Sequence, residues 1–313
     1  MKFGFFTDSH FTDTQPPQRI DDVRRTQRKK LGEILHLILD HGVQAIFHGG
    51  DVFNTKKPSH LLVADIIDWC KRINIPIYSV IGNHDVTGYN LDSVRNSGLG
   101  VLFEAEAVTK LNLEEYPNEK IAIKAIHVEY DPQNFGKAYI FDEKYKDYIR
   151  IIISHNYVIP EKEMPFGFVH PKDIETNAHL VLCGHYHKPF TFSSGNEYKT
   201  LWVNPGSLCR WNVLEDHQPK FILVTIENGK WEIKQLPLQN GKNKKEVFNL
   251  ELIDLQKKQE QDVKKFVQSL EQTAFQNVDV EELISKIGKE QNLDPNIIEL
   301  VLKKVRHAKE VLK

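Results

Sequence analysis

The sequence predicts an α/β protein, with a layered sheet domain over residues 1–240 and a small helix-rich region over residues 241–313. Apolar strand-like runs alternate with amphipathic helical stretches as far as about Leu238, a pattern typical of a sheet covered by helices. Several of these runs end in Asp, Asn or His. Residues 240–245 form a polar, glycine-containing linker, and only helical periodicity recurs beyond it. These observations set both the fold class and the domain boundary.

The composition is that of an ordinary globular protein. Of the 313 residues, 40% are hydrophobic and 27% are charged, and the formal net charge of −2 argues against indiscriminate nucleic-acid binding by the field of the whole protein. No run approaches 18 apolar residues, and Met1–Phe6 begins directly as a strand. We therefore expect a cytoplasmic protein without a membrane partner. Three scattered cysteines favour reduced, buried thiols.

The first half of the chain alternates strands and helices. After the strand at Met1–Phe6, a helix is expected to begin near Asp21 and Asp22 and to end before Gly42. A strand then covers the run from Val43 to Phe47. The next helix opens at Pro58 and Ser59 and stops before a strand that runs from Ile75 to Ile81. The apolar positions of the first helix recur at helical spacing: Leu31, Ile34, Leu35 and Ile38.

The second half continues with short apolar runs at Ile149–Ile153, Leu180–Leu182 and Leu201–Val203. A hairpin is predicted from two further runs, Phe221–Ile226 and Trp231–Leu236, because Asn228 and Gly229 between them are typical of a tight turn.

Beyond the linker, three apolar stripes at helical spacing predict amphipathic helices, the last of them after Asp294 and Pro295. The stripes consist of Val263, Phe266, Val267, Leu270 and Ala274, of Val280, Leu283, Ile284 and Ile287, and of Ile297, Val301, Val305, Ala308 and Leu312.

Five of the predicted strands end in side chains that can bind metal ions. The set contains seven donors, which are too many for one ion but suit two ions that share a carboxylate, and Asp51 in the middle of the set is the natural bridge. Oxygen and imidazole donors without a thiolate favour manganese, iron or zinc. Two such ions can activate a water for phosphoester hydrolysis. The donors are Asp8, His10, Asp51, Asn83, His155, His185 and His187.

His84 and Asp85 follow Asn83 directly, so we expect His84 to face the substrate as general acid or transition-state stabiliser, with Asp85 fixing its tautomer. Each residue alone has a simpler interpretation, because a single Asp or Asn at a strand end is more often a cap. Metal-competent side chains recur at five successive strand ends, and this recurrence favours the metal site over separate caps. His48 and His170 are weaker candidates for substrate contact.

The sequence segments at these five strand ends resemble those of the calcineurin-like metallophosphoesterase superfamily, and the resemblance covers most of residues 1–210. The run 50–59, Gly-Asp-Val-Phe-Asn-Thr-Lys-Lys-Pro-Ser, the run 184–189, Gly-His-Tyr-His-Lys-Pro, and Asn204–Ser207 are similar to the blocks of SbcD-type nucleases, bacterial or phage DNA repair and recombination subunits that act with an SbcC-type ATPase. Asn54 departs from the His that some of these nucleases carry.

This resemblance implies a four-layer αββα sandwich and a preference for manganese. One ion would bind Asp8, His10, Asp51 and His187, and the other would bind Asp51, Asn83, His155 and His185. His84 would match the catalytic histidine of the family. The C-terminal region would dock a partner or cap the DNA. The resemblance leaves undecided whether the chain forms a homodimer. Basic residues between Arg19 and Lys30 form either a phosphate-tracking strip or a solvated helix face.

We therefore predict a manganese-dependent DNA exonuclease or endonuclease in a bacterial cell or phage-infected host. The first alternative is a metallophosphoesterase that acts on a small phosphodiester or a phosphoprotein. The second is a metal-free interaction scaffold, which the complete donor set disfavours.

Overall fold

A computed structural model describes residues 1–129, 131–161, 168–252, 254, 258, 261, 280–290 and 294–311. The chain divides into two compact units, Met1–Phe248 and Asn249–Lys313.

Unit 1 contains two six-stranded sheets. The first sheet has the strand order β12-β11-β1-β2-β3-β4, in which β1 to β4 are parallel and β11 runs antiparallel to β1. Its strands are β1 (Lys2–Phe6), β2 (Ala45–His48), β3 (Ile77–Ser79), β4 (Thr109–Lys110), β11 (Lys220–Glu227) and β12 (Lys230–Pro237).

The second sheet has the order β5-β6-β7-β8-β10-β9, with a parallel centre from β6 to β10 and antiparallel edges. Its strands are β5 (Leu113–Tyr116), β6 (Ile121–Ile126), β7 (Ile149–Ser154), β8 (Leu180–Cys183), β9 (Phe190–Ser193) and β10 (Leu201–Asn204). Residues 113–126 had no assigned strand in our sequence prediction. β5 alternates exposed and half-buried residues and lacks an apolar run, but β6 is such a run and was overlooked.

The helices of unit 1 follow their sequence signals. Helix α1 (Val23–His41) has Asp22 as N-cap and the left-handed Gly42 at its end, as predicted. Helix α2 (His60–Ile73) is capped by Ser59, whose side chain accepts a hydrogen bond from the Leu62 amide. The remaining helices are α3 (Gly98–Glu104), α4 (Lys244–Val247) and the short 3-10 helices η1 (Asn83–Asp85), η2 (Leu91–Asn96), η3 (Pro132–Tyr139), η4 (Glu143–Tyr145) and η5 (Pro171–Asp173).

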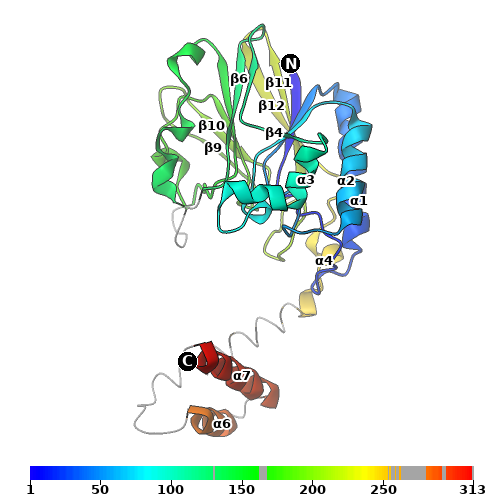
Figure 1. Cartoon of the computed structure of the whole chain (residues 1–313), viewed down its shortest axis with the longest axis vertical. Coiled ribbons are helices and arrows are strands. Elements are labelled where there is room, and N and C mark those ends of the chain that lie inside the picture. The colour runs from blue at the N-terminus through cyan, green and yellow to red at the C-terminus, as the bar shows by residue number, and fades with distance from the viewer. Residues whose placement is uncertain are drawn as a thin grey trace. The chain divides into compact units, whose positions relative to one another are not determined.

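Three apolar clusters hold these elements in four layers. The middle cluster lies between the two sheets and includes Phe3, Phe47 and Ile151. A second cluster packs α1 and α2 onto the outer face of the first sheet, where Figure 1 shows α1, α2 and α3 side by side. The third covers the outer face of the second sheet with η3 to η5, around Tyr139 and Trp202. The predicted αββα sandwich is confirmed, with 3-10 turns as its fourth layer.

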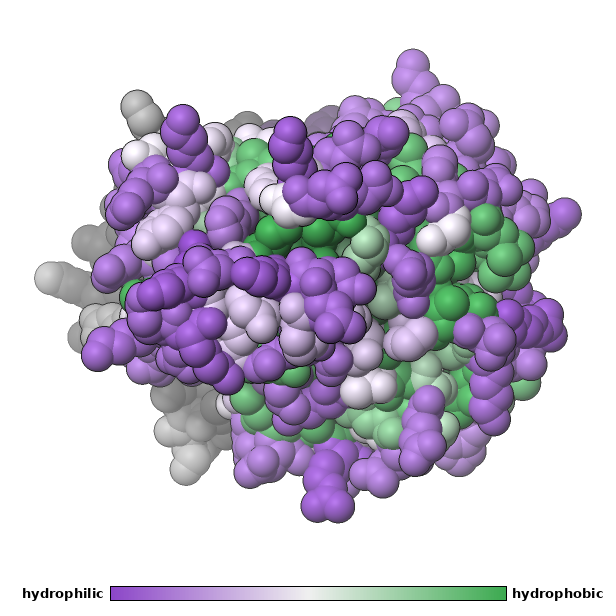
Figure 2. Space-filling model, turned by 90° about the horizontal axis from the view of Figure 1, so that it is seen from above, coloured by the Kyte–Doolittle hydropathy of each residue, from purple (hydrophilic) through white to green (hydrophobic). Residues whose placement is uncertain are grey.

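The face in Figure 2 is largely hydrophilic, and apolar side chains show between the polar ones only in limited patches. Among the described residues, none of the helices combines the length and apolarity that crossing a membrane requires. The three cysteines are buried and free, as the sequence predicted.

Unit 1 ends at Phe248 rather than at residue 240. Val247 and Phe248 are buried, the Ile20 amide donates to the Val247 carbonyl, and Phe248 forms a β-bridge with Arg19. The polar linker is therefore followed by an apolar anchor that keeps α4 on the sheet domain.

Unit 2 contains two described helices, α6 (Val280–Glu290) and α7 (Pro295–Val311). They pack against each other: a side chain at Gly288 would collide with Ile298, and Ile284, Ile297 and Val301 are buried. The sequence predicted both helices. The first predicted stripe, from Val263 to Ala274, and Leu312 lie outside the described residues.

Candidate metal centre

The seven predicted donors follow the carboxyl ends of five parallel strands. Asp8 and His10 follow β1, Asp51 follows β2 and Asn83 follows β3, all in the first sheet. His155 follows β7, and His185 and His187 follow β8, in the second sheet. Because parallel strands end at the same edge, the two stacked sheets bring these loops together. Six of the seven side chains, together with His84, form three overlapping groups with ligand atoms within 4.8 Å of one another: Asp8, His10 and His187; His10, Asp51 and His84; Asp51, His155 and His185.

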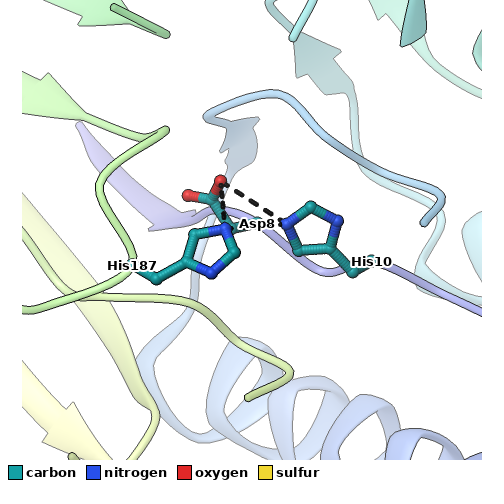
Figure 3. Close-up of side chains that lie close together, drawn as sticks. All are labelled: Asp8, His10 and His187. Atoms are coloured by element: carbon teal, nitrogen blue, oxygen red, sulfur yellow. Dashed lines mark hydrogen bonds and ion pairs between the residues drawn. The ribbon is translucent and has the colours of Figure 1, made fainter. Parts of the chain in front are cut away.

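The first group lies between the two sheets. His10 Nε2 is 2.9 Å from His187 Nε2, and Asp8 Oδ1 is 3.9 Å and 3.6 Å from these two nitrogens (Figure 3). Asp8 and His10 are buried, whereas the His187 side chain is 26% exposed. The group is therefore open to the outside on the side of His187.

Asp51 is common to the other two groups. Asp51 Oδ2 is 3.8 Å from His10 Nε2 and 3.3 Å from His155 Nε2. The side-chain oxygen of Asn83 is also 3.3 Å from His155 Nε2. The rings of His155 and His185 are 5.1 Å apart. Asp51 thus stands where a carboxylate that bridges two ions would stand.

These distances fit divalent ions. Ligands about 2.1 Å from one ion in tetrahedral or octahedral geometry are about 3.0–3.4 Å apart, and the separations given above run from 2.9 Å to 3.9 Å. The contact between His10 and His187 is informative, because Glu215 Oε1 lies 3.0 Å from His187 Nδ1 and accepts a hydrogen bond from it. His187 Nε2 is thereby turned toward His10 Nε2, and an ion that displaced the proton from His187 Nε2 would meet both nitrogens.

The backbone at the centre is held in an unusual conformation. Asp8, His10, Asp51 and His185 have φ values of 51°, 42°, 55° and 73°, in the left-handed region that non-glycine residues rarely adopt. Such conformations persist only where the surroundings enforce them. One enforcing contact is at Gly82, where an added Cβ would lie 2.1 Å from Asp51 Oδ1. The fold therefore positions these donors at a cost in local strain.

Hydrogen bonds from the main chain fix both carboxylates. The His185 amide donates to Asp8 at 3.1 Å, and the His84 amide donates to Asp51 Oδ1 at 2.8 Å. Thr7 Oγ1 also donates to Asp8 at 2.7 Å. The carboxylate oxygens are thereby oriented toward the histidines.

Charge and burial shift the pKa values of the donors in opposite directions. Burial alone would raise the pKa of Asp51, but His155 and His10 overcome it and lower that pKa. Burial opposes a raised pKa at His155, yet Asp51 raises the pKa of that imidazole to about 9. Burial alone would also lower the pKa of His187, but the hydrogen bond to Glu215 outweighs burial and raises that pKa to about 9. The metal-free centre thus retains protons that ions would displace.

Outer partners orient the histidine ligands. His155 Nδ1 lies 2.5 Å from the Gly49 carbonyl, which leaves Nε2 facing Asp51. Glu215 holds His187 in the same way and was absent from our sequence prediction. Its carboxylate also accepts hydrogen bonds from Ser207 Oγ at 2.9 Å and from the Trp211 and Asn212 amides at 3.1 Å and 3.2 Å. Partners of this kind set ligand orientation and basicity.

The predicted role of Asp85 is wrong. His84 Nδ1 lies 2.6 Å from the backbone carbonyl of Asn54, and this carbonyl takes the place expected for Asp85. Asp85 is buried and accepts hydrogen bonds from the amides of Asp51 at 3.1 Å and Gly82 at 2.9 Å. It therefore shapes the loops that carry Asp51 and Asn83, while His84 packs edge-on against His10 with ring centroids 4.7 Å apart.

Two further histidines serve the structure. His48 is buried between Ser9 Oγ, at 2.7 Å, and the Gly50 amide, at 3.1 Å. His170 caps η5 through the Lys172 amide and contacts the Pro160 carbonyl at 3.1 Å.

The basic strip is only partly paired. Arg19 is buried and bonded to Asp21, and Lys30 is buried with its ammonium group 2.5 Å from the Leu208 carbonyl. Arg24 and Arg28 share one carboxylate, that of Asp65. Arg25 and Lys29 are exposed, so a phosphate-tracking strip and a solvated face are both compatible with this helix.

Comparisons with known proteins agree with this geometry. The family model for the calcineurin-like phosphoesterase superfamily domain matches residues 1–229. The chain is 24% identical over 236 residues to the DNA double-strand break repair protein Mre11 of Methanosarcina acetivorans, a match that covers 70% of this chain. The chain spans only about a third of that relative, 36% of its length.

Two solved structures share the fold. A dimetal phosphatase from Danio rerio aligns with a TM-score of 0.50 and 13% identity over 75% of this chain and 96% of its own. The purple acid phosphatase PPD1 from yellow lupin aligns with a TM-score of 0.50 and 12% identity over 77% of this chain and 52% of its own.

Proposed function

The chain belongs to the calcineurin-like phosphoesterase superfamily, and we propose that it hydrolyses phosphodiester bonds of DNA with the help of two divalent ions. The observation that carries the chemistry is the pair of donor groups that share Asp51, with His84 packed beside them. The observation that favours DNA is the similarity to the repair protein Mre11.

We assign four donors to each ion, with manganese as the native metal and iron or zinc as alternatives. Asp8, His10, Asp51 and His187 would hold the first ion, and Asp51, Asn83, His155 and His185 the second. When bound, such a pair of ions supplies charge that acidifies a water and neutralises phosphoryl oxygens.

The protein's own residues orient the substrate and move the proton. The Asn54 carbonyl fixes the Nδ1 side of His84, so Nε2 is the nitrogen left for the substrate. In the protonated ring, this nitrogen can donate to the leaving oxygen of the scissile ester. The half-buried position of His84 next to His10 places that proton beside the centre and within reach of solvent.

Unit 2 is proposed as the docking module for an ATPase partner of the SbcC type. Its two described helices carry buried residues on the faces where they meet, and Leu300 is exposed on α7. An exposed apolar side chain on an amphipathic helix is suited to a groove on another protein. In this proposal the protein acts in DNA repair or recombination.

A second candidate substrate is a small phosphodiester or a phosphoprotein, because both solved structures with this fold are named as phosphatases. The test compares hydrolysis of linear duplex DNA, single-stranded DNA and a chromogenic phosphodiester by the manganese-loaded protein. We expect hydrolysis of DNA as well as of the chromogenic ester. Turnover of the chromogenic ester without any cleavage of DNA would favour the second candidate.

A further inference from the structure

Two partly exposed aromatic rings lie against histidines at the two ends of the metal centre. We propose that Trp211 and Tyr157 stack on the bases that flank the scissile phosphate, so that the preferred substrate is DNA with unpaired bases. This inference rests on the proposed DNA-directed function.

Trp211 stands beside the first donor group. Its ring centroid is 6.4 Å from that of His10, with the planes 79° apart, and the residue is half-buried. Its indole nitrogen is buried and has no hydrogen-bond partner among the described residues. The indole nitrogen of the core residue Trp202 is in the same state, so the ring face rather than this nitrogen is what Trp211 offers to a ligand.

Tyr157 stands beside the last donor group. Its ring centroid is 4.9 Å from that of His185, with the planes 67° apart, and the residue is also half-buried. Neither Tyr157 nor Trp211 belongs to the three apolar clusters that hold unit 1 together. The rings are therefore not explained by core packing.

Glu215 couples Trp211 to the metal centre. The same carboxylate that holds His187 accepts the Trp211 amide, and it fixes the turn between Ser207 and Glu215. A rigid turn presents an aromatic ring at little further entropic cost, which is what a stacking platform requires. Leu214 on the same turn is exposed and has no part in these contacts.

Stacking on aromatic side chains requires bases that are free of a duplex. Each stacked base adds favourable binding free energy whatever its identity, because every base has a π-face. Paired bases at a duplex interior are already stacked on each other, so the two rings select single strands and frayed ends. The selection is by strand state rather than by sequence.

The test compares wild type with Trp211→Ala and Trp211→Phe on two substrates. One is a single-stranded oligonucleotide, and the other is an oligomer of equal length whose nucleotides are all abasic. Trp211→Ala should lower kcat/KM on the normal oligonucleotide by about 5- to 150-fold, the effect of one lost stacked base. On the abasic oligomer the loss should be smaller than twofold, and Trp211→Phe should keep most of the activity on both substrates.

Leu214→Ala is the control on the same turn, and it should behave as wild type on both oligomers. An equal loss on normal and abasic oligomers would overturn the stacking role and leave the proposed function standing. A wild type that cleaves the chromogenic diester but no DNA would overturn both. Should Trp211→Ala be insoluble, Tyr157→Ala decides the matter by the same comparison.

Discussion

Replacing Glu215 by Gln changes one atom of a buried carboxylate that accepts four hydrogen bonds. Oε1 accepts hydrogen bonds from His187 Nδ1 and the Asn212 amide, and Oε2 accepts hydrogen bonds from Ser207 Oγ and the Trp211 amide. An amide has one oxygen, so whichever way it is turned, its NH₂ group faces two donors. The Ser207 hydroxyl can rotate and accept from this NH₂ group, but at least one N–H donor then loses its acceptor, at a cost of about 1–3 kcal/mol.

We therefore expect Glu215→Gln to lower the free energy of unfolding by about 1–3 kcal/mol. The affinity for the ion next to His187 should fall about 10- to 100-fold, as when an outer partner of a ligating histidine is lost. Urea unfolding of the metal-free protein measures the first quantity, and calorimetric titration with Mn²⁺ measures the second.

Asp216→Asn is the matched control, because Asp216 is the neighbouring carboxylate, is exposed and pairs only with Lys244 among the described contacts. This variant should bind ions as wild type does. If Glu215→Gln matched wild type in both unfolding and ion affinity, the carboxylate would not be orienting His187, and our explanation of the ligand geometry would be wrong.

Three further outcomes follow from the centre and from the boundary of unit 1. His84→Ala should keep both ions and lower turnover about 10²- to 10⁴-fold. The loss should be smaller on an ester with an activated leaving group. If metal content fell together with turnover, His84 would be a ligand instead. Because His155 and His187 have pKa values raised to about 9, ion binding at pH 7 should release protons, and affinity should rise toward pH 9. Calorimetric heats that are independent of the buffer would contradict this. Truncation after Phe248 should leave a folded unit that binds ions but no longer associates with an ATPase, whereas an insoluble product would place unit 2 in the catalytic fold.

The proximity of the seven candidate donors could be predicted because each follows a strand whose apolar run is visible. Asp8, Asp51 and His155 stand directly after buried strands, and parallel strands bring their carboxyl ends to one edge. The caps of α1 and α2 and the turn at Asn228 and Gly229 could also be predicted, because they depend on local backbone chemistry.

The partners of the donors could not be predicted in this way. Glu215 is 28 residues from His187 and lies in a loop without periodicity, so nothing local marks their contact. The partner of His84 is a backbone carbonyl at Asn54, which every residue type provides and no sequence pattern singles out. Phe248 extends unit 1 past the polar linker through a β-bridge to Arg19, next to the hydrogen bond from Ile20 to Val247, and these contacts join the two ends of the unit.

The central claim is that one chain binds two ions that share Asp51. The most direct measurement is the metal content of dialysed protein after saturation with Mn²⁺, for wild type and for Asp51→Asn. We predict about two ions per wild-type chain, as for a two-metal site, and the loss of at least one ion together with activity in Asp51→Asn, because an amide cannot neutralise two cations. Saturation of the wild type at one ion per chain, or full activity of Asp51→Asn, would contradict the account.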